Sequence, residues 1–143
     1  MKLFLDTSSL FKLYHNENGT EQVISFFNQN NIHTVFLAEI TKIEFDSVVW
    51  KKLRIGEITR EQAKIIMRNF ERDWIKYLFI EDNQLLKDKA RRFISIYCNE
   101  GLRTLDSIQL ASAVGVKNET DMYLTSDHLL LALFKKEALP TFN

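Results

Sequence analysis

The chain has 143 residues, the usual size of a single domain, and its 45% hydrophobic and 27% charged residues are ordinary for a globular protein. The formal net charge of +0 gives no strongly basic field, so composition alone does not indicate nucleic-acid binding, and the single cysteine, Cys98, excludes an internal disulfide. No run approaches the ~20 apolar residues of a membrane span, and the apolar start is too short for a signal peptide. We therefore expect one domain, residues 1–143, in the cytoplasm and not in a membrane.

Short apolar runs alternate with helical patterns in the first half of the chain, which predicts an α/β domain. A strand is expected over Lys2–Leu5, followed by a short helix that Thr7, Ser8 or Ser9 caps and that runs to about His15. Thr20 is predicted to cap the next helix, after the break at Gly19. A second strand over Thr34–Leu37 then precedes a helix from about Ala38 to Arg54, which Gly56 ends.

The second half repeats this alternation. Thr59 and Gln62 form the pattern of a capping box at the start of a further helix. The remaining elements are expected in this order: a strand over Tyr77–Ile80, a helix that Asp82 caps and that runs towards Asn99, a helix from Thr104 to Val114, a strand over Met122–Thr125, a helix over His128–Lys136 and a last strand at Thr141–Phe142. This order predicts a three-layer α/β/α fold with a five-stranded parallel sheet and a ligand crevice beyond the carboxyl ends of the strands.

Two acidic residues follow predicted strands directly. Asp6 comes after the first strand, and Asp127 stands two residues after the strand that ends at Thr125. Both side chains are therefore expected at the carboxyl edge of the sheet, facing the crevice. The alternative for each is a helix N-cap, a position where Asp is common.

Two further acidic residues lie on predicted helices. The helical pattern places Glu44 in an apolar stripe with Ile40 and Val48, where an unpaired charge is unfavourable. A buried salt bridge to a lysine or arginine is the alternative explanation. Asp106 lies in the first turn of its helix, where the dipole favours an anion, so it could be either a site residue or an ordinary helix-start acid.

Together, Asp6, Glu44, Asp106 and Asp127 predict a metal site. Four ionised carboxylates in one crevice repel one another and would raise their own pKa values unless a cation lies among them. Oxygen ligands alone favour Mg²⁺ or Mn²⁺ over zinc. Such ions activate water for the hydrolysis of phosphodiester bonds, which is the chemistry that we expect.

Four sequence blocks resemble the PIN-domain ribonucleases, in particular the VapC-type toxins of toxin–antitoxin pairs. These blocks are residues 5–14 (LDTSSLFKLY), 37–44 (LAEITKIE), 102–111 (LRTLDSIQLA) and 123–128 (YLTSDH). Each block is short and unspecific alone, but the four occur in the family's order. The resemblance extends from Lys2 to Leu139.

The resemblance implies an Mg²⁺- or Mn²⁺-dependent endoribonuclease, a homodimer, and a cognate antitoxin that occupies the active-site groove. It implies that Asp6, Glu44, Asp106 and Asp127 are the metal ligands, and that Ser8 and Thr125 orient a carboxylate or a water molecule. The sequence departs from the family pattern at Gln109, where histidine is frequent, and Ser126 is one of several residues tolerated before the last acid. The choice of RNA stays open.

Other functions fit the sequence less well. A receiver domain needs a lysine after the fifth strand, and none stands near Thr141; a haloacid-dehalogenase phosphatase needs a second Asp where Ser8 stands. The alternative from another class is a PIN-fold module without catalytic activity that only pairs with an antitoxin or a scaffold.

Three basic features stay undecided. Lys51 could contact a phosphate or belong to a solvated helix end. His128 could reach RNA or only start a helix. The run Lys87–Arg92 could face RNA, or it could be the exposed face of a helix.

Overall fold

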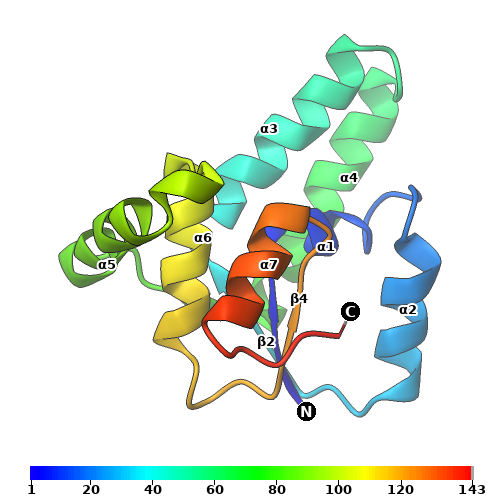
Figure 1. Cartoon of the computed structure of the whole chain (residues 1–143). Helices are drawn as coiled ribbons and strands as arrows, with labels where there is room; N and C mark the ends of the chain where they lie inside the picture. Colours follow the sequence, from blue (N-terminus) through cyan, green and yellow to red (C-terminus); the bar gives the residue numbers. More distant parts are fainter. Residues whose placement is uncertain (143) are drawn as a thin grey trace.

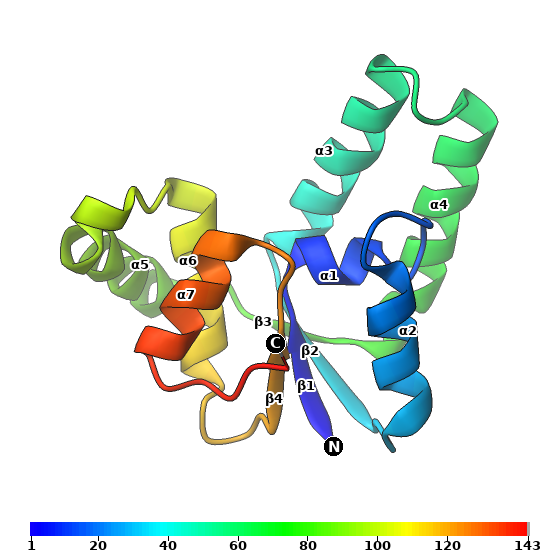
Figure 2. The same ribbon diagram turned by 45° about the vertical axis from the view of Figure 1, so that its right-hand side comes forward.

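A computed structural model describes residues 1–142; Asn143, the last residue of the predicted domain, lies outside the described residues. Its centre is a parallel sheet in the order β3-β2-β1-β4 (Figures 1 and 2). The strands are β1 (Lys2–Leu5), β2 (Thr34–Ala38), β3 (Leu78–Ile80) and β4 (Met122–Leu124). All four therefore end at the same edge of the sheet.

The prediction of a fifth strand at Thr141–Phe142 is wrong, because the sheet has four strands. The chain after α7 makes only an isolated parallel bridge, between Tyr123 and Thr141. The Tyr123 amide donates to the carbonyl oxygen of Pro140 over 2.8 Å, and the Phe142 amide donates to the carbonyl oxygen of Tyr123 over 3.3 Å. Pro140 has no N–H to add to a ladder, so the segment lies beside β4 without extending the sheet further.

Helices cover both faces of the sheet, which confirms the three-layer α/β/α prediction. One face carries the helices α1 (Thr7–Phe11), α2 (Thr20–Gln29), α3 (Thr41–Arg54) and α4 (Arg60–Asp73); the other carries α5 (Gln84–Ile96), α6 (Thr104–Gly115) and α7 (His128–Lys136). Two short 3₁₀ turns, η1 (Trp74–Lys76) and η2 (Cys98–Glu100), complete the structure. Figure 2 shows the sheet edge-on between the two groups of helices.

The strands β1, β2 and β4 are largely apolar because most of their residues are buried between the two layers of helices, whereas β3, at the edge, is more exposed. Leu3 and Leu5 point into the core beneath α1–α4, whereas Phe4 between them points into the core beneath α5–α7. In β2, Phe36 lies on the same side as Phe4. This alternation holds the sheet between two hydrophobic cores and fixes which strand ends reach the molecular surface.

Several helix starts differ from the sequence predictions. Gly19, with a φ of 90°, is the N-cap of α2, so Thr20 is its first residue and not its cap. The predicted helix from Ala38 begins at Thr41, because Ala38 still pairs with Ile80 in the sheet. Asn83, not Asp82, caps α5 through a hydrogen bond from the Leu86 amide.

Helices α6 and α1 also begin at other N-caps than the sequence predicted. The N-cap of α6 is Arg103, which makes no side-chain cap, so Thr104 belongs to the first turn. Helix α1 ends at Phe11, earlier than predicted, and its cap is Asp6. The capping box of α4, between Thr59 and Gln62, is confirmed.

The arrangement at the carboxyl edge of the sheet defines the site. Helices α3 and α4 form a hairpin that projects beyond the sheet, and α6 and α7 stand opposite it (Figure 1). The first turns of α1 and α7 follow β1 and β4 closely and so lie at this edge of the sheet. Within residues 1–142, no helix has the length and apolarity needed to span a membrane.

Candidate active site

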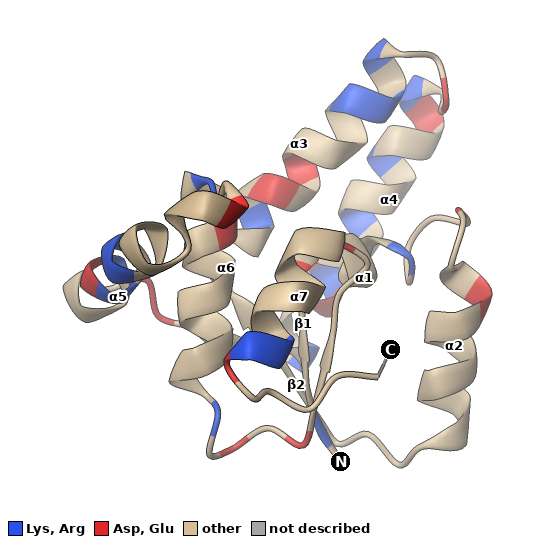
Figure 3. Cartoon of the chain, viewed as in Figure 1, with Lys and Arg blue, Asp and Glu red and all other residues tan. Residues whose placement is uncertain are grey.

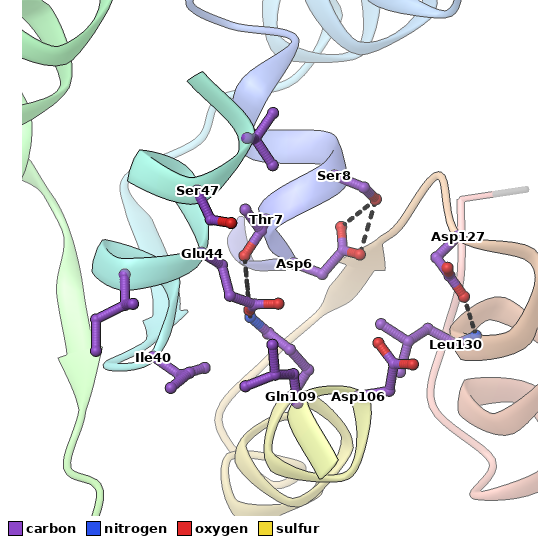
Figure 4. Close-up of a pocket in the computed structure, with 13 residues that line it drawn as sticks. Asp6, Thr7, Ser8, Ile40, Glu44, Ser47, Asp106, Gln109, Asp127 and Leu130 are labelled. Atoms are coloured by element: carbon purple, nitrogen blue, oxygen red, sulfur yellow. Dashed lines mark hydrogen bonds between the residues drawn. The ribbon is translucent and has the colours of Figure 1, made fainter. Parts of the chain in front are cut away.

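The four acids predicted from the sequence line one cleft at this edge of the sheet, with a volume of about 330 Å³. They come from the β1–α1 junction, α3, α6 and the β4–α7 junction. Figure 4 shows their carboxyl groups around one open space. The structure therefore brings together all four predicted site residues, and the predicted crevice beyond the strand ends is present. The site wall also includes apolar side chains, among them Ile43 and Leu105.

Asp6 is held at the centre of the cleft floor. It is 2% exposed, and its Oδ1 accepts hydrogen bonds from the Ser9 amide (3.0 Å) and the Ser8 hydroxyl (2.8 Å). Its Oδ2 accepts one from the Thr125 hydroxyl at 2.7 Å. Ser8 and Thr125, the two orienting residues that the resemblance implied, therefore both contact Asp6.

The same hydroxyl groups tie the ends of β1 and β4 together. The Ser126 amide donates to the Ser8 Oγ over 2.9 Å, and the Asp127 amide donates to the Thr125 Oγ1 over 3.0 Å. The strands are adjacent in the sheet, and the Asp6 amide donates to the Leu124 carbonyl oxygen over 3.2 Å. This network fixes the spacing of the two strand-end segments.

Asp127 resembles Asp6 in its local structure. It is the N-cap of α7, and its Oδ1 accepts a hydrogen bond from the Leu130 amide at 2.8 Å. Asp6 is likewise the N-cap of α1. The alternatives that the sequence left open are thus both true, because each residue caps a helix and also lines the cleft.

Glu44 is held by neutral donors and not by a cation. Its Oε1 accepts hydrogen bonds from the Gln109 Nε2 at 2.6 Å and from the Thr7 hydroxyl at 3.0 Å. Within residues 1–142 no lysine or arginine forms an ion pair with it, so the alternative explanation, a buried salt bridge, is wrong. The predicted stripe is also only partly right, since Ile40 precedes the helix as its N-cap residue.

Gln109 is the residue of the site whose role the sequence did not reveal. It is 1% exposed, and its Nε2 lies within 3.1 Å of the hydroxyl oxygens of Thr7 and Thr41 as well as near Glu44. Its Oε1 is buried without a hydrogen-bond partner among the described residues. The available signal was its position one helical turn after Asp106, where an inward-facing polar residue lies on the same face of α6.

Asp106 is the least constrained of the four acids. It is partly buried in the first turn of α6, and its carboxylate makes no hydrogen bond within the part of the chain that the structure describes. The helix dipole and the nearby Arg103 favour its charge. It is therefore available to a ligand in the cleft.

Burial and mutual repulsion shift the titration of this group. Burial is the main cause that raises the pKa of Asp6 above its usual value, and the hydrogen bonds that it accepts do not cancel this effect. The pKa of Glu44 is raised by burial and by the charges of Asp6 and Asp106. Burial and the charge of Asp127 raise the pKa of Asp106. The cleft thus favours the addition of positive charge.

The chemistry of these side chains fits a hard divalent cation. All four offer carboxylate oxygens, which Mg²⁺ and Mn²⁺ prefer. A cation would offset the burial that mainly raises the pKa values of Asp6, Glu44 and Asp106, and it would also relieve the smaller contribution of repulsion. Among residues 1–142, no three His, Cys, Asp or Glu side chains converge closely enough to hold one ion as they stand. A cation would therefore have to draw the carboxylates inwards.

Comparison with known proteins gives a fold but no close relative. No family model and no curated protein matches the chain. Among solved structures, the chain is similar to VapC20 of Mycobacterium tuberculosis, a sarcin-ricin loop cleaving toxin, with a TM-score of 0.69 and 14% identity over 92% of this chain and 94% of that one.

Two further structures give the same result. FitAcB from Neisseria gonorrhoeae has a TM-score of 0.66 and 16% identity over 99% of this chain and 96% of that one. VapBC2 from Rickettsia felis, bound to a DNA fragment from their promoter, has a TM-score of 0.64 and 16% identity over 100% of this chain and 98% of that one. The resemblance to PIN-domain toxins of the VapC and FitB kind is thus confirmed at the level of the fold, over nearly the whole chain.

Proposed function

We propose that the protein is a metal-dependent endoribonuclease and the toxin of a toxin–antitoxin pair. The observation that carries this proposal is the gathering of four carboxylates, from four separate segments, in one cleft of a PIN-type fold. The similar VapC20 is a sarcin-ricin loop cleaving toxin, which supports RNA as the substrate class.

Asp6, Glu44, Asp106 and Asp127 would hold the Mg²⁺ or Mn²⁺. When bound, the metal supplies a Lewis acid that favours attack by water and stabilises the negative charge that develops on the phosphodiester oxygens. The cleft is open to solvent on the side of Ile43 and Leu105, which are 69% and 47% exposed, so an RNA strand can approach the acids from there.

The neighbouring polar side chains orient the carboxylates. Ser8 and Thr125 donate to the two oxygens of Asp6, which fixes the rotation of this carboxylate. Gln109 and Thr7 donate to one oxygen of Glu44 and leave the other free. Partners of this kind keep a ligand in the orientation that its metal requires and so reduce the reorganisation needed for reaction.

Partners belong to the same proposal. VapBC2 was solved bound to a promoter DNA fragment, and we propose that this chain also pairs with a DNA-binding antitoxin that covers the cleft. The homodimer implied by the family resemblance stays a prediction, which light scattering on the purified chain can test.

One observation favours the alternative of a module without catalytic activity. No three acidic side chains in residues 1–142 converge on one point as they stand. Repulsion between like charges keeps the carboxylates apart, so this spacing also agrees with a site that closes around a cation. Metal binding therefore distinguishes the two functions.

The test is cleavage of a mixed RNA pool with Mg²⁺, with Mn²⁺ and with a chelator, comparing the wild type with Asp106→Asn. We expect cutting that requires metal and is lost in the variant. Calorimetry with Mn²⁺ runs in parallel. If the wild type neither binds metal nor cuts, the nuclease is excluded and the binding module is the better assignment.

A further inference from the structure

A second cavity continues the acidic cleft along α3. It has a volume of about 320 Å³ and shares Thr7, Ser8 and Val48 with the cleft. The other residues that line it include Phe11, Lys51, Lys52 and Ile55. We call it the lysine groove. Because the two cavities have walls in common, one extended ligand can occupy both.

Helix α3 provides the common wall. Glu44, Val48, Lys51 and Ile55 recur at spacings of three and four residues, so they lie along one face of the helix. Figure 3 shows the same gradient, with acidic residues near the start of α3 and basic residues near its end. This face of α3 therefore leads from the carboxylate of Glu44 to the ammonium group of Lys51 along the path that a strand would follow.

Most of the charge in the lysine groove is neutralised internally. Lys52 forms ion pairs with Glu17 at 3.2 Å and with Glu57 at 2.9 Å. Lys12 pairs with Glu17 at 2.7 Å. These two lysines and two glutamates balance one another.

Lys51 is the exception. It is exposed, and among the charged side chains that line the groove in residues 1–142 it alone has no ion pair. Its ammonium group is therefore available to an anion from outside the chain, and binding that anion breaks no existing contact. A lysine bound to a phosphate acts as a point charge, and the exposed stem leaves it free to adjust its position.

Seven residues separate Glu44 from Lys51, which is about 10 Å along a helix. One nucleotide step advances a stacked strand by about 3.4 Å. A separation of about 10 Å corresponds to about three such steps, so the phosphate that Lys51 reaches belongs to a nucleotide further along the strand and not to the bond at the acids.

We propose that the lysine groove is a phosphate subsite for the RNA strand beside the scissile bond, with Lys51 as its binding residue. This inference rests on the proposed nuclease function and names how the substrate is held there. The contact is to the backbone, so it strengthens binding of every sequence and sets the register of the strand without selecting bases.

The experiment measures binding of a short, fluorescein-labelled single-stranded RNA of mixed sequence at several KCl concentrations and fixed Mg²⁺. All variants carry Asp106→Asn, so that the RNA is not cut. The variants compared with this parent are Lys51→Met, Lys51→Arg and Lys135→Met. Lys135 is a matched control because it is also exposed and unpaired within residues 1–142, but lies in the last turn of α7, at the opposite end from Asp127.

Loss of one phosphate contact to a single strand reduces the slope of log K against log salt by about 0.7. We expect this reduction for Lys51→Met, and slopes like the parent's for Lys51→Arg and Lys135→Met. In the cleaving protein, Lys51→Met should raise KM several-fold with kcat nearly unchanged. An unchanged slope for Lys51→Met overturns the subsite even if the wild type cuts RNA. A reduced slope for Lys51→Met, without any RNA cleavage by the wild type, supports the phosphate subsite and excludes the nuclease function.

Discussion

The two halves of the cleft are built by different means. Asp6 and Asp127, at the ends of adjacent strands, are held by backbone amides as helix caps, and Asp6 also by two hydroxyl groups. On the helices, Glu44 is held only by side chains, and Asp106 accepts no hydrogen bond within residues 1–142. The strand-end half is therefore set by local structure, whereas the helix half depends on how α3 and α6 pack.

This difference predicts that the two pairs of acids contribute differently to stability and to activity. The strand-end acids should contribute to folding as well as to function, because they satisfy donors that would otherwise be buried and unpaired. Asp106 should be needed for function while lowering stability, because burial disfavours its charge and its carboxylate accepts no hydrogen bond within residues 1–142. Four sets of variants test this comparison.

The largest effect is expected for Asp6→Ala and Asp106→Ala. Each should lower RNA cleavage by more than about a hundredfold, beyond the loss expected when only a hydrogen-bonded neighbour of a metal ligand is removed. Asp6→Ala should also lower the free energy of unfolding by about 1–2 kcal/mol, since α1 loses its cap and hydroxyl groups lose their acceptor. Denaturant unfolding of both proteins checks this. Equal free energies of unfolding for Asp6→Ala and Asp106→Ala would contradict the distinction between the two halves of the cleft.

Gln109→Met should lower cleavage by about 10- to 100-fold, because it removes the donor to Glu44 while keeping a side chain of similar volume. Gln109→His can restore a donor, and we expect it to recover part of the activity. The Mn²⁺ affinity, measured by calorimetry, should follow the same order. If both variants lose activity equally without a change in metal affinity, Gln109 acts only through packing.

A smaller effect is expected at the hydroxyl groups that orient Asp6. Thr125→Val keeps the shape of the side chain but removes its 2.7 Å hydrogen bond, so cleavage should fall by about tenfold. Ser47→Ala is the control, since Ser47 lines the same cleft but donates to none of the acids. A loss as large in the control would show that any change in the cleft disturbs the reaction.

The smallest effect concerns pH. The pKa of Asp106 is raised in the fold, so its contribution to stability is greatest below the usual value of 3.8 and is lost as the pH rises through the raised pKa. Asp106→Asn should therefore be more stable than the wild type without metal, by up to about 1 kcal/mol at neutral pH given solvent screening. Melting temperatures between pH 4 and 8 test this.

The matched control is Glu119→Gln, at an exposed residue whose side chain makes no hydrogen bond or ion pair within residues 1–142. We expect no gain there. Added Mg²⁺ should reverse the order of wild type and Asp106→Asn, because only the wild type retains all four carboxylates. If Asp106→Asn is not more stable than the wild type at any pH, the charge of the Asp106 carboxylate does not destabilise the fold.

The strand-end part of the site could be predicted from the chain alone. A residue directly after a parallel strand must lie at the carboxyl edge of the sheet, whatever the details of packing. This argument placed Asp6 and Asp127 correctly. The helix N-cap was the alternative for each residue, and only the structure shows that one side chain fills both positions.

The helix part could be predicted only in outline. The spacing placed Glu44 and Asp106 on inward faces, but the partner of Glu44 is Gln109, which is 65 residues away in the chain. No local pattern encodes such a pair. The sequence therefore left a salt bridge open as an alternative for Glu44, and the start of α3 was predicted too early because pairing of Ala38 with β3 extended the strand.

The sequence by itself determined the layers of the fold, since alternating apolar runs and helical patterns follow from the backbone period and the need to bury one face. It also determined which acids could meet. Tertiary structure decided the number of full strands, the caps of α2, α5 and α6, and the hydrogen bonds that orient each carboxylate. These depend on which groups approach across the sheet, and such contacts are set by the packing of the whole chain.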